Sequence, residues 1–234
     1  MNRRDLCVFL GSPIALNSAV MSSDRSRAWA VDDGATDITP SYTMTHTEGE
    51  LFTFVRATFF YWQLRKYVEL NPAGSIAVNG ELLTGMSEEP GAYSYTGKVA
   101  VSPSGTYRFD LARAAEKKFS HTFELPSLKL VEYPLKINRN LAIHARLAAG
   151  ATLGPDENLT LQILVPQNRF GMPGTAVGDF VTFENIKGTM LPAGRFEAKI
   201  FSQIKTPLRK ISDAFATGWA TASYSKKFIV EISP

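Results

Sequence analysis

Cysteine and histidine are scarce in this sequence. The chain of 234 residues has one cysteine, Cys7, and three histidines, His46, His121 and His144. Because Cys7 lies close to the N-terminus, in a segment that we expect to be removed, the mature chain forms no disulfide and offers no thiolate to zinc or an iron–sulfur cluster. No pair of histidines has the HxH or HExxH spacing that aims two imidazoles at one metal. We therefore expect no metal site and no cofactor.

Catalytic motifs are also lacking. The sequence has no GxSxG elbow for a serine nucleophile. Asp32, Asp33 and Asp37 lack the spacing of a calcium loop. Two opposed carboxylates such as Asp110 and Glu124 would be enough for glycoside hydrolysis, and the sequence does not exclude such a pair. We predict that the protein is not an enzyme, with a hydrolase that uses a dispersed carboxylate site as an alternative.

The excess of positive charge is confined to the N-terminus. Four of the 25 basic residues and two of the 22 acidic residues lie in the first 30 positions, which leaves 21 against 20 in the rest. After residue 30 the sequence has no cluster of Lys and Arg with interleaved aromatic residues. The nearly neutral remainder argues against nucleic acid as a partner.

No hydrophobic run is long enough to span a bilayer. The apolar stretch from Leu6 to Met21 is interrupted by Gly11, Pro13 and Asn17, whereas a transmembrane helix needs about 20 apolar residues. It follows two arginines and precedes the small residues Ala28 and Ala30, which is the order of a secretory signal peptide. We predict a signal peptide at residues 1–30 and a periplasmic or secreted mature chain without a transmembrane anchor.

The leader resembles a twin-arginine export signal. The resemblance depends on Arg3, Arg4, Asp5 and Leu6, on the weak hydrophobicity that follows, and on Arg25 and Arg27 near the predicted cut. The family often has Phe-Leu-Lys after the arginines, where this chain has Leu6, Cys7 and Val8. The route therefore stays open between twin-arginine export and general secretion.

The rest of the chain has the period of two that is typical of strands. In LFTFVRATFFYWQ, residues 51–63, alternation predicts two faces. One face holds Phe52, Phe54, Arg56, Thr58, Phe60 and Trp62, and the other holds Leu51, Val55, Ala57, Phe59 and Tyr61. Further alternating runs follow, and Asn79-Gly80 predicts a two-residue hairpin turn in which both residues have positive φ. The pattern predicts an all-β fold of antiparallel sandwiches.

A short motif occurs twice. Pro103, Gly105 and Tyr107 in SPSGTYRF match Pro192, Gly194 and Phe196 in LPAGRFEA, which predicts a tight turn that leads into a strand in each half. Gly105 with Tyr107, and Gly194 with Phe196, resemble a strand-leading corner of the immunoglobulin-like sandwich domains of bacterial surface and periplasmic proteins. The chain lacks that fold's disulfide and packed tryptophan, so the resemblance implies architecture and no activity.

The bridge ELPSLKLVEYPLKINRN contains Pro126 and Pro134, which stiffen a linker. We predict two tandem immunoglobulin-like sandwiches, at residues 31–126 and 127–234. One large sandwich is the alternative, since all-β domains reach this length.

Aromatic residues on both faces of one strand exceed what a single core needs. Burial of both faces, in the core and at a domain seam, is the simpler interpretation. The alternative is a ligand or partner surface, for which the candidate residues are Arg56, Tyr61, Trp62, Arg65 and Trp219. We expect a non-catalytic binding or assembly module of the periplasm or cell surface, with another envelope protein or a glycan as partner. Carbohydrate binding through Tyr61, Trp62 or Trp219 is the first alternative to that expectation.

Overall fold

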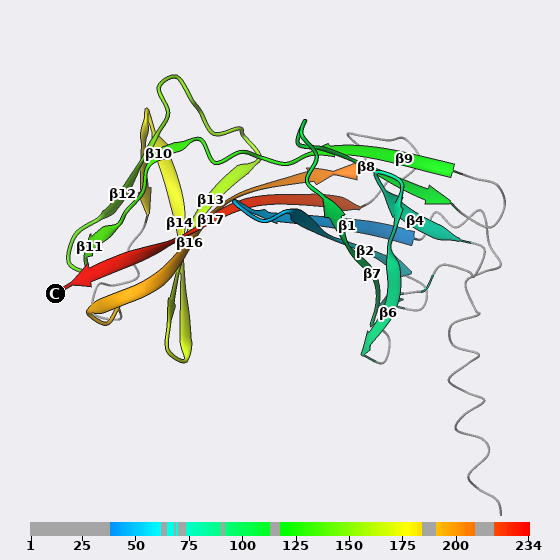
Figure 1. Ribbon diagram of the computed structural model, residues 1–234, viewed down its shortest axis with the longest axis horizontal. Helices are drawn as coiled ribbons and strands as arrows, with labels where there is room; N and C mark the ends of the chain where they lie inside the picture. Colours follow the sequence, from blue (N-terminus) through cyan, green and yellow to red (C-terminus); the bar gives the residue numbers. More distant parts are fainter. Residues whose placement is uncertain are drawn as a thin grey trace, which may run out of the picture.

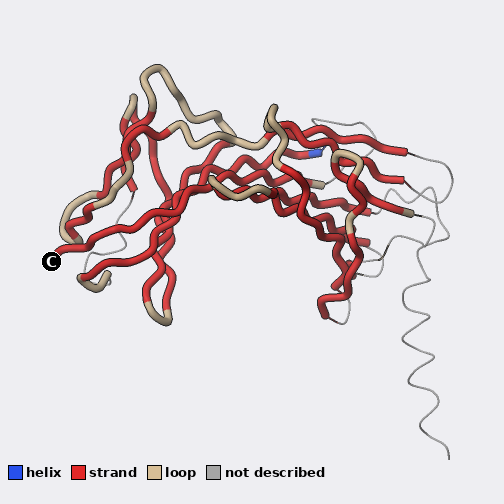
Figure 2. The backbone as a smooth tube through the Cα atoms, in the orientation of Figure 1, coloured by secondary structure: helices blue, strands red, loops and turns tan. Residues whose placement is uncertain are grey.

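The computed structural model describes residues 38–61, 65–67, 69, 74–89, 92–112, 118–183, 191–208 and 218–234. Within these ranges the regular secondary structure is almost entirely β-strand, which confirms the all-β prediction (Figure 2). The same ranges contain no helix of the length and apolarity needed to cross a bilayer. The predicted leader and Trp62 lie outside the described residues.

The strands form two sheets. The larger sheet has the order β10-β12-β15-β14-β13-β16-β17-β1-β2-β7-β6, with β11 on β17 and β3 on β2, and the smaller sheet has the order β5-β4-β8-β9. The strands are β1 Ile38–Thr47, β2 Phe52–Tyr61, β3 Lys66–Tyr67, β4 Ser75–Val78, β5 Glu81–Leu82, β6 Thr84–Glu89, β7 Ala92–Ala100, β8 Thr106–Ala112, β9 Lys118–Glu124, β10 Leu130–Glu132, β11 Lys136–Asn138, β12 Ile143–Leu147, β13 Glu157–Val165, β14 Asn168–Val177, β15 Phe180–Phe183, β16 Gly194–Pro207 and β17 Trp219–Ser233.

The first lobe is a sandwich of the smaller sheet on one half of the larger sheet. Tyr42 and Phe59 of the larger sheet are buried against Phe109 and Phe123 of the smaller one, and the Tyr42 ring lies 4.8 Å from the Phe109 ring and 5.7 Å from the Phe123 ring. Alternation along β2 buries Val55, Ala57 and Phe59 as predicted. This lobe confirms the prediction of a β-sandwich.

The second lobe has a core of its own, to which the smaller sheet contributes no side chain. Its buried residues come from β10 to β17 of the larger sheet and from Leu191. The larger sheet therefore coils around this core, with the short strands β10 and β11 at the two ends of the coiled part (Figure 1).

The hairpin of β16 and β17 joins the two lobes (Figure 1). At one end of the paired strands, the first core includes Leu208, Ala220 and Ala222. At the other end of the hairpin, Ala198, Ile200, Val230 and Ile232 belong to the second core. The predicted division between residues 126 and 127 stays a prediction, and the last two strands serve both lobes.

Two strand pairs depart from the antiparallel arrangement that we predicted. β1 is parallel to β17, with Ser41 opposite Trp219, and β11 is also parallel to β17. Parallel neighbours need a long connection between them. Here the connection from β1 to β17 is almost the whole described chain. Alternation within a segment does not reveal a pairing between strands so far apart in sequence.

The predicted turns have the expected backbone. Asn79 and Gly80 have φ of 51° and 86°, and they join β4 to β5 with Val78 opposite Glu81, which confirms the hairpin. Gly105 and Gly194 also have positive φ, and each lies at the start of a strand, β8 and β16 respectively. The aromatic residue that follows Gly105, Tyr107, is fully buried.

A polar cluster lies between the two cores. Lys226 Nζ is 3.0 Å from Glu48 Oε1 and 4.9 Å from the centre of the Tyr133 ring. The His46 ring lies 5.2 Å from the Tyr224 ring, and Ser225 Oγ donates a hydrogen bond to the His46 carbonyl oxygen at 3.1 Å. β1 and the linker after the first lobe are thereby both tied to the middle of β17.

Candidate functional site

The outer face of the larger sheet carries a row of polar side chains in the first lobe. Ser41 of β1 pairs with Thr58 of β2 on one side and with Trp219 of β17 on the other. One row further along, Thr43 pairs with Arg56. Because Val55, Ala57 and Phe59 point into the core, these residues point away from it. The register thus places Arg56 and Trp219 on the same face, two strands apart.

A groove opens where the larger sheet splits. β7 pairs with β2 only as far as Ala57 opposite Tyr95, whereas β3 pairs with β2 at Phe60 and Tyr61. At the gap between the two pairings lies a cavity of about 220 Å³. Its lining residues are Ser41, Thr43, Arg56, Thr58, Tyr67, Ala92 and Tyr93. Three hydroxyl side chains, a guanidinium and two phenols therefore meet in one place.

Tyr93 forms a fixed wall of the groove. Its hydroxyl donates a hydrogen bond to Glu69 Oε1 at 2.9 Å, and burial together with the nearby Glu69 carboxylate raises the pKa of Tyr93 to about 12. A Cβ at Gly85 of β6 would collide with the Tyr93 hydroxyl and would lie 3.0 Å from the ring. Glycine at position 85 leaves the room that the Tyr93 ring occupies.

Two exposed rings flank the polar row. The Tyr67 side chain is 43% exposed, and its ring packs edge-on against Phe60 at 5.3 Å. Trp219 is 44% exposed, with Lys205 Nζ 4.4 Å from the centre of its ring. Three strand spacings separate β3 from β17, roughly 14 Å.

The structure brings together some of the predicted surface residues. Arg56 lines the groove, and Trp219 lies on the same face. Tyr61 is on the other face of β2, partly buried against the first core. Arg65 is exposed in the turn before β3, with φ of 50°, and it is not among the lining residues of the groove. Trp62 lies outside the described residues.

The sequence did not single out Ser41, Thr43, Tyr67 or Tyr93. Alternation assigns faces within a strand, but it does not tell which strands lie side by side. β3 has two residues, too few to show a period. A pattern of Ser41, Thr43 and Thr45 on one face of β1 was the available signal, and it is common on solvated sheet faces.

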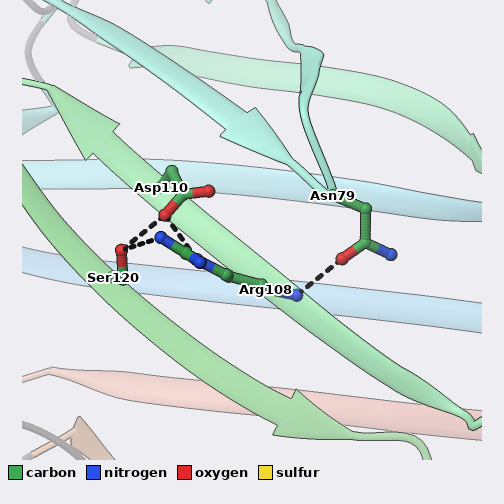
Figure 3. A network of polar contacts seen from close by, with 4 residues as sticks. All are labelled: Asn79, Arg108, Asp110 and Ser120. Carbon is green, nitrogen blue, oxygen red and sulfur yellow. Dashed lines mark hydrogen bonds and ion pairs between the residues drawn. The ribbon is translucent and has the colours of Figure 1, made fainter.

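The outer face of the smaller sheet carries a polar network. Arg108 Nε donates to Asp110 Oδ1 at 2.8 Å and Arg108 Nη2 to Ser120 Oγ at 3.0 Å, while the Arg108 backbone N–H donates to Asn79 Oδ1 at 2.8 Å (Figure 3). Asp110 is opposite Ser120, and Glu124 lies four positions further along β9. The spacing along a strand places Asp110 and Glu124 roughly 13 Å apart. Glycosidases hold their two carboxyl groups at about 5 to 9.5 Å, so this pair does not fit that chemistry.

Another carboxylate, Glu157, is buried in a set of hydrogen bonds. Its oxygens accept from Ser202 Oγ at 2.6 Å, from the Gly154 N–H at 3.1 Å and from Lys129 Nζ at 2.9 Å. Burial alone would raise the pKa of Glu157, but these three donors outweigh it and hold the pKa below its usual value. Glu157 therefore fixes the linker at Lys129 to the second lobe, and it opens into no described cavity.

None of the three histidines is among the lining residues of the groove. His121 is buried in the first core beside Tyr42, with ring centres 5.5 Å apart, and burial lowers its pKa. His46 is buried near Thr53, and His144 is paired with Thr182 Oγ1 at 3.1 Å. In the ranges that the structure describes, no three His, Cys, Asp or Glu side chains converge as they would on a metal ion.

No protein-family model and no curated protein matches the sequence. Similar solved structures include the Bacteroides ovatus protein SGBP-B of a mixed-linkage glucan utilization locus in complex with a heptasaccharide, at 12% identity and a TM-score of 0.24. The match covers 81% of this chain and 43% of that one. The plexin A4 extracellular region is matched at 8% identity over 82% of this chain and 27% of that one, with a TM-score of 0.25.

An I-band fragment of titin is also similar, at 10% identity and a TM-score of 0.19, over 85% of this chain and 64% of that one. The chain thus spans less than half the length of the first two structures. TM-scores at this level support no inference about the function of this chain.

Proposed function

We propose that this protein is an exported, non-catalytic binding module of the bacterial periplasm or cell surface. The observation that carries the proposal is the groove at the split between β3 and β7, which combines hydroxyl groups, one guanidinium and aromatic rings on an otherwise regular sheet. Concave sites that hold a few convergent polar groups are the usual places for ligands.

The chemistry of the lining supports binding over catalysis. The seven described lining residues include no carboxylate, imidazole or thiol. The hydroxyls of Ser41, Thr43 and Thr58 therefore have no general base beside them in that lining, and a nucleophilic hydroxyl requires one. Hydroxyl and guanidinium groups are, in contrast, well suited to hydrogen-bonding a ligand in fixed orientation.

The export part of the proposal depends on the N-terminal pattern. An arginine pair, a short interrupted apolar run, and small residues at positions 28 and 30 precede the mature chain. A mature chain without cysteine also has no thiol to misoxidise in an oxidising compartment. The proposal leaves the route open between twin-arginine export and general secretion.

Two measurements test this function. Cell fractionation with N-terminal sequencing should find a chain that starts near Val31 in the envelope or the medium, and a chain that keeps Met1 in the cytosol would contradict export.

Chemical cross-linking in intact cells, followed by purification, should capture a reproducible envelope protein or glycan. Capture should be reduced by the groove variant Arg56→Ala and unchanged by Arg108→Ala on the smaller sheet. Equal capture with both variants would contradict the groove as the binding surface.

A further inference from the structure

We propose that the groove and Trp219 form one oligosaccharide-binding site, in which the sugar chain crosses β2, β1 and β17 on the outer face of the larger sheet. This inference rests on the proposed function, because it names the ligand class of the same surface. It adds a direction of binding and assigns Tyr67 and Trp219 as the two stacking residues.

The lining matches the chemistry of a sugar. A pyranose ring presents hydroxyl groups that both donate and accept hydrogen bonds, and a flat C–H face that is apolar. Ser41, Thr43 and Thr58 also donate and accept, and the Arg56 guanidinium adds N–H donors. The rings of Tyr67 and Tyr93 supply flat apolar surface next to those polar groups.

The two exposed rings fix the direction. Tyr67 lies at the groove on one side of β2, and Trp219 lies beyond β1 on the other side, with Thr58 and Ser41 in the row between. A distance of roughly 14 Å between β3 and β17 exceeds one sugar ring and suits an oligosaccharide. Lys205, now 4.4 Å from the Trp219 ring, is exposed on β16 and has a flexible stem, so it moves aside or contacts sugar hydroxyls when a ring stacks there.

Other ligand classes fit this surface less well. Phosphate groups favour several cations or a helix N-terminus, whereas the described lining has one cation, Arg56. A peptide that adds a strand needs an open sheet edge. β1 is paired on both sides, with β2 and β17, so the row from Thr58 to Trp219 presents side chains. The break in pairing along β2 spans only Thr58 and Phe59, which is too short for an added strand.

The test uses the purified mature chain, from Val31 to Pro234, on an array of neutral and acidic homo-oligosaccharides, followed by calorimetry with the strongest binder. We expect binding that strengthens from the monosaccharide to the longer oligomers. Tyr67→Ala and Trp219→Ala should each weaken it about tenfold or more, as for loss of one stacked ring. Phe180→Ala is the matched control, because it removes a ring of 52% exposure from the second lobe, and it should leave binding unchanged.

A second pair of variants guards against misfolding. Thr43→Val and Thr58→Val keep the side-chain shape and suit a strand, but they remove one hydroxyl each. Weaker binding at an unchanged melting temperature supports the inference. Absence of binding to every oligosaccharide overturns it, as does binding that Tyr67→Ala and Trp219→Ala leave intact. Capture of an envelope protein through Arg56, together with an empty array, would leave the proposed function standing and remove the sugar ligand alone.

Discussion

His121 shows how the environment of one residue links structure to pH. The imidazole is 1% exposed and lies among the rings of Tyr42 and Phe123, at 5.5 and 6.3 Å. Burial disfavours its charged form and lowers its pKa below the usual 6.5. In the unfolded chain the same imidazole takes up a proton at its ordinary pKa.

The first prediction concerns acid sensitivity. The unfolded state binds the proton more readily than the folded state, because burial lowers the pKa of His121 in the folded state. The contribution of neutral His121 to the free energy of unfolding is therefore fully present above about pH 6.5, and it is lost as the pH falls toward the lower folded-state pKa. The free energy of unfolding should therefore decrease by up to about 1.4 kcal/mol per pH unit in that range. Urea unfolding at a series of pH values measures this slope. His121→Leu should flatten it, and an equal slope in that variant would contradict the assignment.

The residue scale also shows what sequence reasoning reaches. The shared face of His121 with Phe119 and Phe123 follows from alternation, and the structure confirms it, since Phe119 packs against the core in which the other two are buried. The positive φ of Asn79 and Gly80 follows from their chemistry. The role of Tyr107 could not be predicted from alternation. Its hydroxyl forms a hydrogen bond with Thr53 Oγ1 at 2.6 Å and accepts one from the Ser102 N–H at 3.1 Å. Thr53 lies 54 positions away in sequence.

At the scale of elements, β2 explains why both of its faces are rich in aromatic residues. One face lies in the first core, and the other forms part of the outer surface, where Phe52 and Phe54 are 50% and 44% exposed. Burial of both faces, the interpretation that we favoured from the sequence, is therefore wrong for these two residues. The outer surface continues into the groove because β2 has no β7 partner beyond Ala57, which is opposite Tyr95.

The second prediction concerns Gly218, the residue directly before Trp219. Gly218 has φ of 123°, and a Cβ there would lie 2.5 Å from the Pro40 carbonyl oxygen and 2.8 Å from Leu208 Cδ1. Gly218→Ala should therefore lower the free energy of unfolding by more than about 2 kcal/mol, because it strains the backbone and displaces β1.

Gly178→Ala is the matched control for Gly218→Ala. Gly178 also has positive φ, 63°, but no atom lies within 4 Å of the added Cβ. Gly178→Ala should lower the free energy of unfolding by only about 1 to 2 kcal/mol, the usual penalty for a non-glycine residue in the left-handed conformation. Thermal unfolding of the two variants separates the two contributions, and equal losses would show that the close approach to Pro40 is unimportant.

The limits of sequence reasoning are clearest for the pairing of elements. Alternation predicts strands and their faces, but register shifts of two residues and different strand orders satisfy it equally well. The neighbours of β17 are an adjacent strand in the chain, β16, and two distant ones, β1 and β11. The pairing of β1 with β17 puts Trp219 on the face that carries Arg56, and alternation within a segment does not reveal that pairing.

The whole molecule is held together by strands that serve two cores. β17 lies between β16 and β1 in the sheet of the first lobe, and its other end packs in the second core. Lys226 and Glu48, 178 positions apart, add a bond at the middle of this strand. The two lobes should therefore depend on one another for stability.

The third prediction tests this dependence with fragments. Residues 31–126 made alone lack Leu208, Ala220 and Ala222 of the first core and leave β1 without its parallel neighbour. This fragment should show no cooperative unfolding, and mixing with residues 127–234 should restore it. Circular dichroism and amide NMR dispersion measure the outcome. A fragment 31–126 that folds cooperatively by itself would instead show that the first lobe is an independent domain.

The parallel pairing of β1 with β17 sets the order of events when the protein is made. β1 leaves the ribosome well before β17, because the paired residues Ser41 and Trp219 are 178 positions apart. At a synthesis rate of about 5 to 20 residues per second, β1 waits roughly ten to forty seconds for that neighbour. During this interval Tyr42 and Met44, both buried in the finished protein, lack part of their cover. Until β17 is made, β1 therefore has one open edge, and an open strand edge is a place where another chain can pair.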